Sequence, residues 1–145
     1  MRRCGNGTRT AEPTVKRRAS VSVELLIVTP VFLVMLLGFV ELSMIVLVEE
    51  RLAAASAQGA RVASQGGSYT DIEAAVNTYL GPGPIAENLK PLKYTPLNPT
   101  TANSGDPVTV RVEVEGSKVV PDLLRFIGFG LSGQILVGQT TLRKE

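Results

Sequence analysis

The 145-residue sequence contains no histidine and only one cysteine, and these two shortages limit the chemistry open to it. Histidine is the commonest general base and a frequent metal ligand, so its absence excludes Ser-His-Asp and Cys-His catalytic sites. The single thiol, Cys4, lies ahead of a long apolar segment, which excludes a disulfide within the chain and a structural zinc site. Glu113 and Glu115 lie on one face of a predicted strand, but such a carboxylate pair is typical of a solvated face. We therefore expect no catalytic residues, no cofactor and no metal.

Polar residues are also scarce from Leu25 to Val48, where the chain reads LLIVTPVFLVMLLGFVELSMIVLV with only Thr29, Glu41 and Ser43 polar. At about 1.5 Å per residue a helix of this length spans roughly 36 Å, enough to cross a hydrocarbon layer of about 30 Å. A chain of this size could not surround such a helix on all sides, which argues against a buried helix of a soluble protein. The segment is predicted to be a transmembrane helix.

The charge distribution orients this helix. Residues 1–18 carry six basic side chains and one acidic side chain, which leaves nine basic and twelve acidic residues in the rest of the chain. Lys16-Arg17-Arg18 precedes the apolar run, and Glu49-Glu50 follows it. The positive-inside bias therefore places the N-terminus in the cytoplasm. The basic tail explains the alkaline isoelectric point without nucleic-acid binding.

A secretory signal peptide is the main alternative for this segment. Ala55-Ser56-Ala57 supplies an A-x-A cleavage pattern. The apolar core, however, is longer than the usual 7–15 residues, and Glu41 interrupts it near its end. Removal of the segment after Ala57 remains an alternative to permanent anchoring.

The helix is predicted to continue beyond the membrane from Arg51 to Gln65, a stretch rich in alanine and free of proline, and to end at Gly66-Gly67. Small side chains recur along it at 4-3-4 spacing, at Ala53, Ala57, Ala60 and Ser64. Such a face allows a second helix to approach closely, or allows this helix to pack on its own domain. Both interpretations stay open.

A short amphipathic helix is predicted next. Thr70 to Glu73 matches a capping box, with Thr70 as the N-cap and Glu73 reaching back to it. The apolar face of this helix, about ten residues long, is formed by Ile72, Ala75, Val76, Tyr79 and Leu80. Gly81-Pro82-Gly83-Pro84 ends it.

Strands follow in the last third of the chain. Residues 108–115 (VTVRVEVE) alternate strictly, with valines on one face. A short strand is expected near Leu92–Thr95, and residues 134–142 are the expected partner strand, with Ile135 and Val137 on one face. The intervening stretch 119–131 is apolar and broken by proline and glycine. Because two strands alone are marginally stable, they must pair with a third strand or pack on the helices, which predicts an α+β body.

The stretch RRASVSVEL, from Arg17 to Leu25, resembles the start of TadE/TadF-like pseudopilins of the tight-adherence (Flp-type) pilus system. Members of that family have basic residues, a small residue, four further residues and then a glutamate that opens the apolar helix. The matching positions here are Arg17-Arg18, Ala19 and Glu24, followed by Pro30, by Glu41 as the second glutamate, and by Ala57–Ala63 as the Gly-Ala-Arg segment. The resemblance covers residues 17–67 well and the remainder loosely.

The resemblance implies that a prepilin peptidase cuts the chain between Ala19 and Ser20, although an uncleaved anchored form remains an alternative. The family usually has glycine where Ala19 stands. Glu24 would pair with the α-amino group of Ser20 on a neighbouring subunit, or it would only cap the helix. Glu41, inside the apolar run, must snorkel outward, become protonated or find a partner, and contact with a helix of the assembly is favoured over snorkelling.

Together these expectations divide the chain into a basic cytoplasmic leader (1–19), a transmembrane helix (20–48), a helix extension (49–66) and a small extracytoplasmic α+β domain (67–145). The resemblance implies a non-catalytic pseudopilin of the bacterial inner membrane that takes part in the assembly of such a pilus or a related secretion apparatus. Its partners would be the inner membrane, the prepilin peptidase and other pilins or pseudopilins, with no nucleic acid and no small-molecule substrate. The alternative is a signal-anchored envelope protein whose outer domain binds a partner unrelated to pili.

Overall fold

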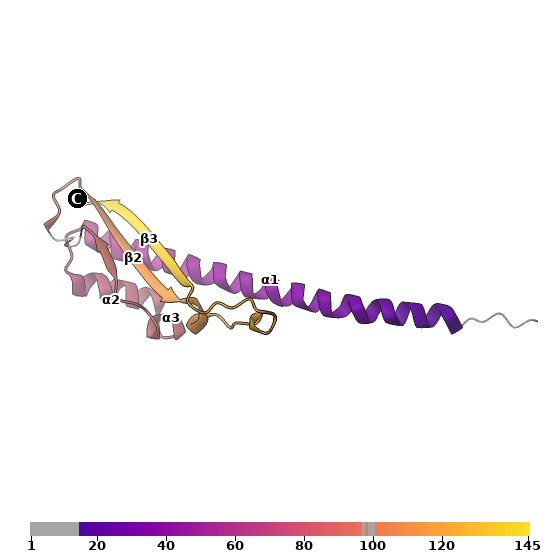
Figure 1. Cartoon of the computed structure of the whole chain (residues 1–145). Coiled ribbons are helices and arrows are strands. Elements are labelled where there is room, and N and C mark those ends of the chain that lie inside the picture. The colour runs from indigo at the N-terminus through magenta and orange to yellow at the C-terminus, as the bar shows by residue number, and fades with distance from the viewer. Residues whose placement is uncertain (1–14, 97, 99–100) are drawn as a thin grey trace, which may run out of the picture. The chain divides into compact units, whose positions relative to one another are not determined.

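The computed structural model describes residues 15–96, 98 and 101–145, with side chains from Val23 onward. Its longest element is helix α1, Val15–Ser64, an uninterrupted helix of 50 residues (Figure 1). The predicted continuation of the helix beyond the apolar run is confirmed. Gly66, at φ +82°, ends it, because the amides of Gly66 and Gly67 turn back to the carbonyls of Ala63 and Val62 in a Schellman cap.

The chain divides into two compact units, residues 1–36 and 37–145. The described part of the first unit is the N-terminal portion of α1. The second unit contains the rest of α1 and every other helix and strand that the structure describes.

Helix α2, Tyr69–Leu80, begins two residues earlier than the sequence predicted. Thr70 as the N-cap was wrong: the N-cap is Ser68, and its partner in the capping box is Asp71 rather than Glu73. The Ser68 hydroxyl accepts from the Asp71 amide, and the Asp71 carboxylate accepts from the Ser68 amide at 2.9 Å. Both pairs have the three-residue spacing of a capping box, so the spacing alone could not choose between them. Gly81 ends the helix as predicted, and a single helical turn, α3 (Pro84–Glu87), follows.

Three antiparallel strands form the sheet, in the order β1 (Lys93–Thr95), β2 (Pro107–Glu115) and β3 (Ile135–Arg143). The pairing of β2 with β3 runs over nine residues of each strand, from Pro107 opposite Arg143 to Glu115 opposite Ile135. Between these two strands lie the short helix α4 (Gly116–Val119) and a 3-10 turn, η2 (Arg125–Ile127). The α+β fold predicted from the sequence is confirmed.

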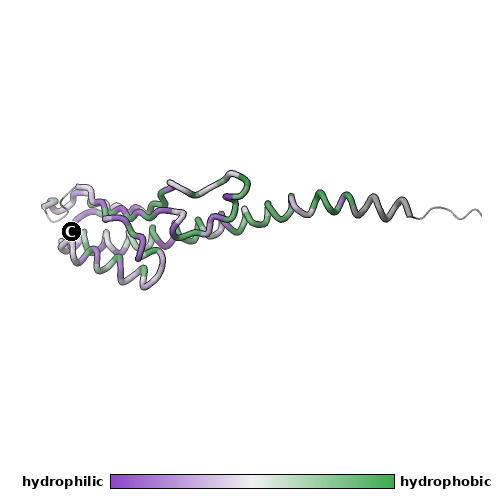
Figure 2. Tube along the Cα trace, turned by 60° about the horizontal axis from the view of Figure 1, so that its bottom comes forward, coloured by the Kyte–Doolittle hydropathy of each residue, from purple (hydrophilic) through white to green (hydrophobic). Residues whose placement is uncertain are grey.

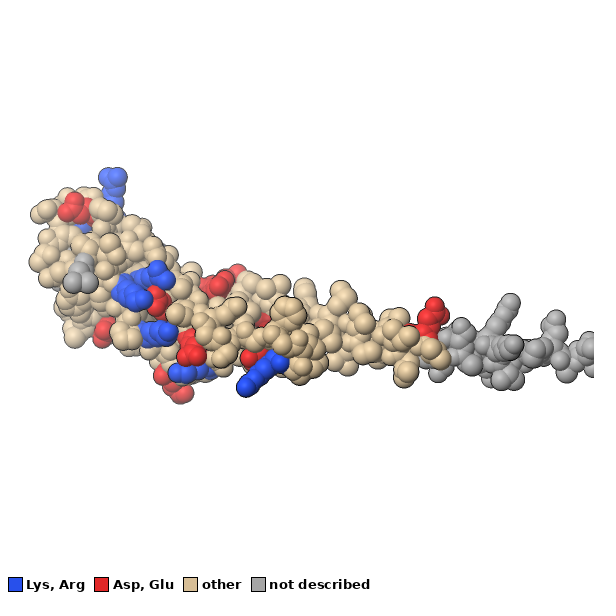
Figure 3. Space-filling view, in the orientation of Figure 1, with Lys and Arg blue, Asp and Glu red and all other residues tan. Residues whose placement is uncertain are grey.

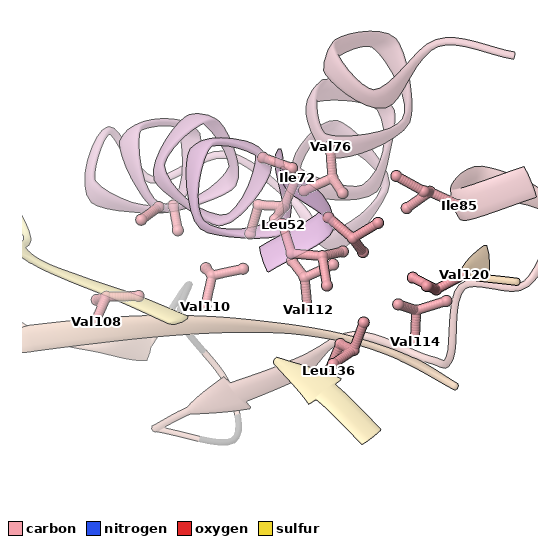
Figure 4. Close-up of a cluster of buried hydrophobic side chains, with 14 of the residues drawn as sticks. Leu52, Ile72, Val76, Ile85, Val108, Val110, Val112, Val114, Val120 and Leu136 are labelled. Carbon is pink, nitrogen blue, oxygen red and sulfur yellow. The ribbon is translucent and has the colours of Figure 1, made fainter. Parts of the chain in front are cut away.

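The core lies between β2 and the two longer helices. Figure 4 shows the β2 valines on the side of the strand that faces Leu52 of α1 and Ile72 and Val76 of α2. The four valines of β2 and these three residues are fully buried: Val108, Val110, Val112, Val114, Leu52, Ile72 and Val76. The alternation read from the sequence therefore identified the inner face of β2.

The small residues of α1 pack on the chain's own domain. Ala55, Ala60 and Ala63 belong to the buried core, and a Cβ added at Gly59 would lie 2.9 Å from Val76 and 3.3 Å from both Ile72 and Val110. In the predicted stripe, Ala60 and Ser64 are buried and Ala57 is half-buried, so packing within the domain is confirmed for Ala60 and Ser64. Ala53, which the predicted stripe included, is exposed.

Candidate membrane and assembly site

The apolar part of α1 is covered by very little protein. Among the described residues, one helix is long and apolar enough to cross a membrane, within Val23–Ser64. Leu26, Met35 and Phe39 each expose 70% or more of their surface. Figure 2 shows this part of α1 as a mainly hydrophobic stretch, and Figure 3 shows charged side chains gathered over the domain rather than along it. Soluble monomers rarely expose so large an apolar surface, and one such helix near the N-terminus fits a single-pass membrane anchor.

The polar side chains in this apolar run make hydrogen bonds within the chain. The Thr29 hydroxyl donates to the carbonyl of Leu25 at 2.7 Å, and the Ser43 hydroxyl donates to the carbonyl of Phe39 at 2.8 Å. Both hydroxyls thus bond back one turn along the helix, to the carbonyl four residues earlier.

Glu41 is the third polar residue of the run, and it is 6% exposed. One of its carboxylate oxygens, Oε2, accepts from the amides of Leu123 and Leu124 at 3.1 and 3.0 Å. The sequence offered three outcomes for this carboxylate, namely snorkelling, protonation or a partner, and a helix of the assembly was the favoured partner. The structure instead supplies partners from its own chain, which sequence reasoning missed because backbone amides carry no residue-specific signal. A contact of Glu41 with another subunit stays a prediction.

The predicted processing site lies near the described start of α1. Ala19 and Ser20 are part of its helical backbone, and Glu24 is exposed. Glu24 belongs to the first compact unit and Glu41 to the second. Most of the predicted leader, including Cys4, lies outside the described residues.

Glu113 lies in an ion-pair cluster on the outer face of the sheet. Its carboxylate is 2.9 Å from Lys93 Nζ and 2.7 Å from Arg111 Nε, and its side chain is only 3% exposed. The hydrogen bond from Lys93 and the charges of Lys93, Arg111 and Lys90 lower the pKa of Glu113, although burial opposes this shift. The prediction that Glu113 and Glu115 lie on a solvated face was wrong for Glu113. The reason is that β1 pairs with β2 opposite Arg111 and brings Lys93 over the carboxylate.

Two further groups have displaced pKa values. Burial, with smaller contributions from Glu73 and Tyr69, raises the pKa of Tyr94 to about 12. The hydrogen bonds from Ser68 lower the pKa of Asp71. Neither shift moves a pKa toward neutrality, as general acid–base catalysis near pH 7 requires.

Comparison with known families decides the identity of the anchoring segment. Residues 19–61 match the family model described as TadE-like protein. This segment is TadE-like. The match begins at the predicted processing site and covers Glu24, the apolar run and the part of the small-residue segment up to Arg61. It confirms the resemblance inferred from the sequence over these residues.

The TadE-like segment includes both glutamates of the predicted site, and the domain that packs against its C-terminal part lies outside the match. Searches of curated proteins and of solved structures find nothing that matches the chain. The TadE-like family implies a role in the tight-adherence (Flp-type) pilus system.

Proposed function

We propose that this protein is a non-catalytic, membrane-anchored pseudopilin that takes part in assembling a tight-adherence pilus or a related secretion apparatus. The observation that carries the proposal is the TadE-like match over residues 19–61, which joins a small residue, Glu24 and an apolar helix in one segment. Helix α1 holds the subunit in the inner membrane, with its N-terminus in the cytoplasm. The α+β domain makes contacts outside the membrane.

Permanent retention of the helix is supported by the core. Leu52, Ala55 and Ser56 are fully buried and belong to α1. A cut after Ala57, as the signal-peptide alternative requires, would remove all three from the folded domain. Removing one buried leucine side chain typically costs about 2–5 kcal/mol, so the domain would lose much of its stability.

Cleavage between Ala19 and Ser20 leaves that core intact. N-terminal sequencing of the mature chain, in cells with a matching prepilin peptidase, should therefore begin at Ser20. Ala19→Leu should block the cut because a bulky residue replaces a small one, and Ala19→Gly is the matched control that should still be cut. A mature chain beginning at Gln58 would favour the signal-peptide alternative, and one beginning at Met1 would refute processing.

Glu24 distinguishes assembly from simple anchoring. If its carboxylate pairs with the Ser20 amine of a neighbouring subunit, Glu24→Gln leaves that amine without its counter-charge in a low-dielectric setting. Membrane insertion should then be normal, whereas cross-linking between subunits and pilus formation should fail. Glu49→Gln makes the same chemical change at an exposed carboxylate beyond the apolar run and should assemble normally. Normal assembly of Glu24→Gln would refute the pairing of Glu24 with the Ser20 amine and leave Glu24 as a helix cap.

A further inference from the structure

The connection between α4 and β3 carries large apolar side chains that no other described part of the chain covers. We call residues 121–131 the apolar loop. Phe126 and Phe129 are 67% and 71% exposed, and Ile127 is 42% exposed. Aromatic side chains with this exposure are unusual on a surface that faces only water. The loop therefore needs a partner that covers these side chains.

The loop is fixed to a defined level of α1. Glu41 accepts hydrogen bonds from the amides of Leu123 and Leu124, and Leu124 Cδ1 lies 3.4 Å from where a Cβ would stand on Gly38. These residues all belong to the unit 37–145. The base of the loop thus lies beside Gly38–Glu41, which is part of the apolar run.

That level corresponds to the outer boundary of a bilayer. The first charged residue after Glu41 on α1 is Glu49, eight residues later or about 12 Å along the axis. The headgroup layer on one side of a membrane is roughly 5–8 Å thick, so Glu41 lies only about 4–7 Å inside the hydrocarbon when Glu49 is just outside the headgroups. Phe39 and Leu42, at the same level of α1, are 72% and 58% exposed. The base of the loop and these exposed side chains of the helix therefore lie at one level of α1.

We propose that the apolar loop is a second membrane contact, which dips into the outer interfacial layer and buries Phe126, Ile127 and Phe129 among lipids. The inference rests on the proposed function, because it requires α1 to span the membrane. One helix alone leaves its tilt and rotation to be set by other contacts. A loop inserted on one side of α1 fixes both, and so fixes which face of the domain is turned toward neighbouring subunits.

The backbone and charges of the loop suit this boundary layer. Irregular backbone is costly in hydrocarbon unless its polar groups are bonded, and several amides of the loop have partners in the chain. Glu41 accepts from Leu123 and Leu124, the amide of Ile127 donates to Leu124 at 3.1 Å, and the Asp122 carboxylate accepts from Leu131 at 3.3 Å. Arg125, exposed next to Phe126, can extend its guanidinium to lipid phosphates while its neighbour stays in the apolar layer.

Depth-dependent fluorescence quenching tests the inference on the full chain in lipid vesicles. Three single-cysteine variants are made in a Cys4→Ser background and labelled with an environment-sensitive probe. Phe126→Cys reports on the loop, and Phe39→Cys reports on the span. Ser104→Cys is the distal control: it precedes the start of β2, and the nine residues of that strand extend about 30 Å toward the loop. Brominated lipids should quench the probes at positions 39 and 126 several-fold more than the probe at 104.

The outcomes separate the two proposals. If the probe at 39 is quenched but the probe at 126 is quenched no more than the one at 104, the loop contact is overturned and the membrane anchor stands. A probe at 126 that is shielded from water but not quenched by lipid would also overturn it, since protein would then cover the loop. Absence of quenching at 39 would overturn the membrane anchor and, with it, the loop contact.

Discussion

Strand β3 packs so tightly on α1 at Gly138 that a single added methyl group is expected to have a large effect. Gly138, opposite Val112 in the sheet, is buried. A Cβ at Gly138 would overlap the backbone of Leu52 and Ala53 rather than a side chain that could rotate away. Because the middle of a helix cannot yield locally, Gly138→Ala must push β3 from α1 and loosen the packing around Leu52 and Val112.

Overpacking of a core usually costs 1–3 kcal/mol, and a clash with backbone on a buried face belongs at the upper end, at about 3 kcal/mol. With a urea dependence of about 1–3 kcal/mol per molar, the unfolding midpoint should fall by roughly 1–3 M. Pulse proteolysis of the full chain in detergent, across a urea series, measures this midpoint, because the protease cuts only unfolded domain.

Gly116→Ala is the matched control. A Cβ there would meet its nearest atoms, Gln134 O and Leu136 Cγ, at 3.5 and 3.7 Å, which is ordinary contact. Its midpoint should change by no more than the equivalent of about 0.5 kcal/mol. Equal midpoints for Gly138→Ala and the wild type would refute the close approach of β3 to α1.

Two further perturbations follow from the polar contacts of the domain. Glu113→Gln should destabilise the domain by about 1–2 kcal/mol, less than for a fully buried ion pair because Lys93 and Arg111 are themselves partly exposed. Since the pKa of Glu113 is lower in the folded state, its contribution to the free energy of unfolding is complete above the ordinary pKa of 4.5 and is lost as the pH falls through the lower folded pKa. Unfolding midpoints measured between neutral and acidic pH should therefore show this loss in the wild type and not in Glu113→Gln. Ser68→Ala should cost about 1 kcal/mol by removing the N-cap of α2, and Thr70→Ala should cost clearly less; equal costs in the same proteolysis assay would contradict the assignment of Ser68 as the cap.

The elements that the sequence predicted well are those whose signal is local. The apolar run from Leu25 to Val48 is defined by its length and lack of charge, and the structure places it in one exposed helix. The alternation of valines from Val108 to Val114 follows from the two-residue period of a strand, and all four are buried. Gly66 and Gly81 end their helices because a glycine adopts positive φ without steric cost.

Strand β3 shows why other features could not be predicted in this way. Ile135 and Val137 share a face, as expected, but the buried positions are Leu136 and Gly138 on the opposite face. Apolar side chains occur on both faces of this strand, so its pattern alone does not choose between them. The choice is made by α1, which approaches so closely at Leu52 that only a glycine fits.

The sequence by itself identified the TadE-like motif and a helix long enough to span a membrane, and its flanking charges predict the direction of that helix, because each of these depends on residues close together in the chain. The tertiary structure alone decided which distant groups meet. It placed the amides of Leu123 and Leu124 on Glu41, 82 and 83 residues away, and brought Lys93 over Glu113. A carboxylate in an apolar run shows that a partner is required, but only the path of the folded chain determines what that partner is.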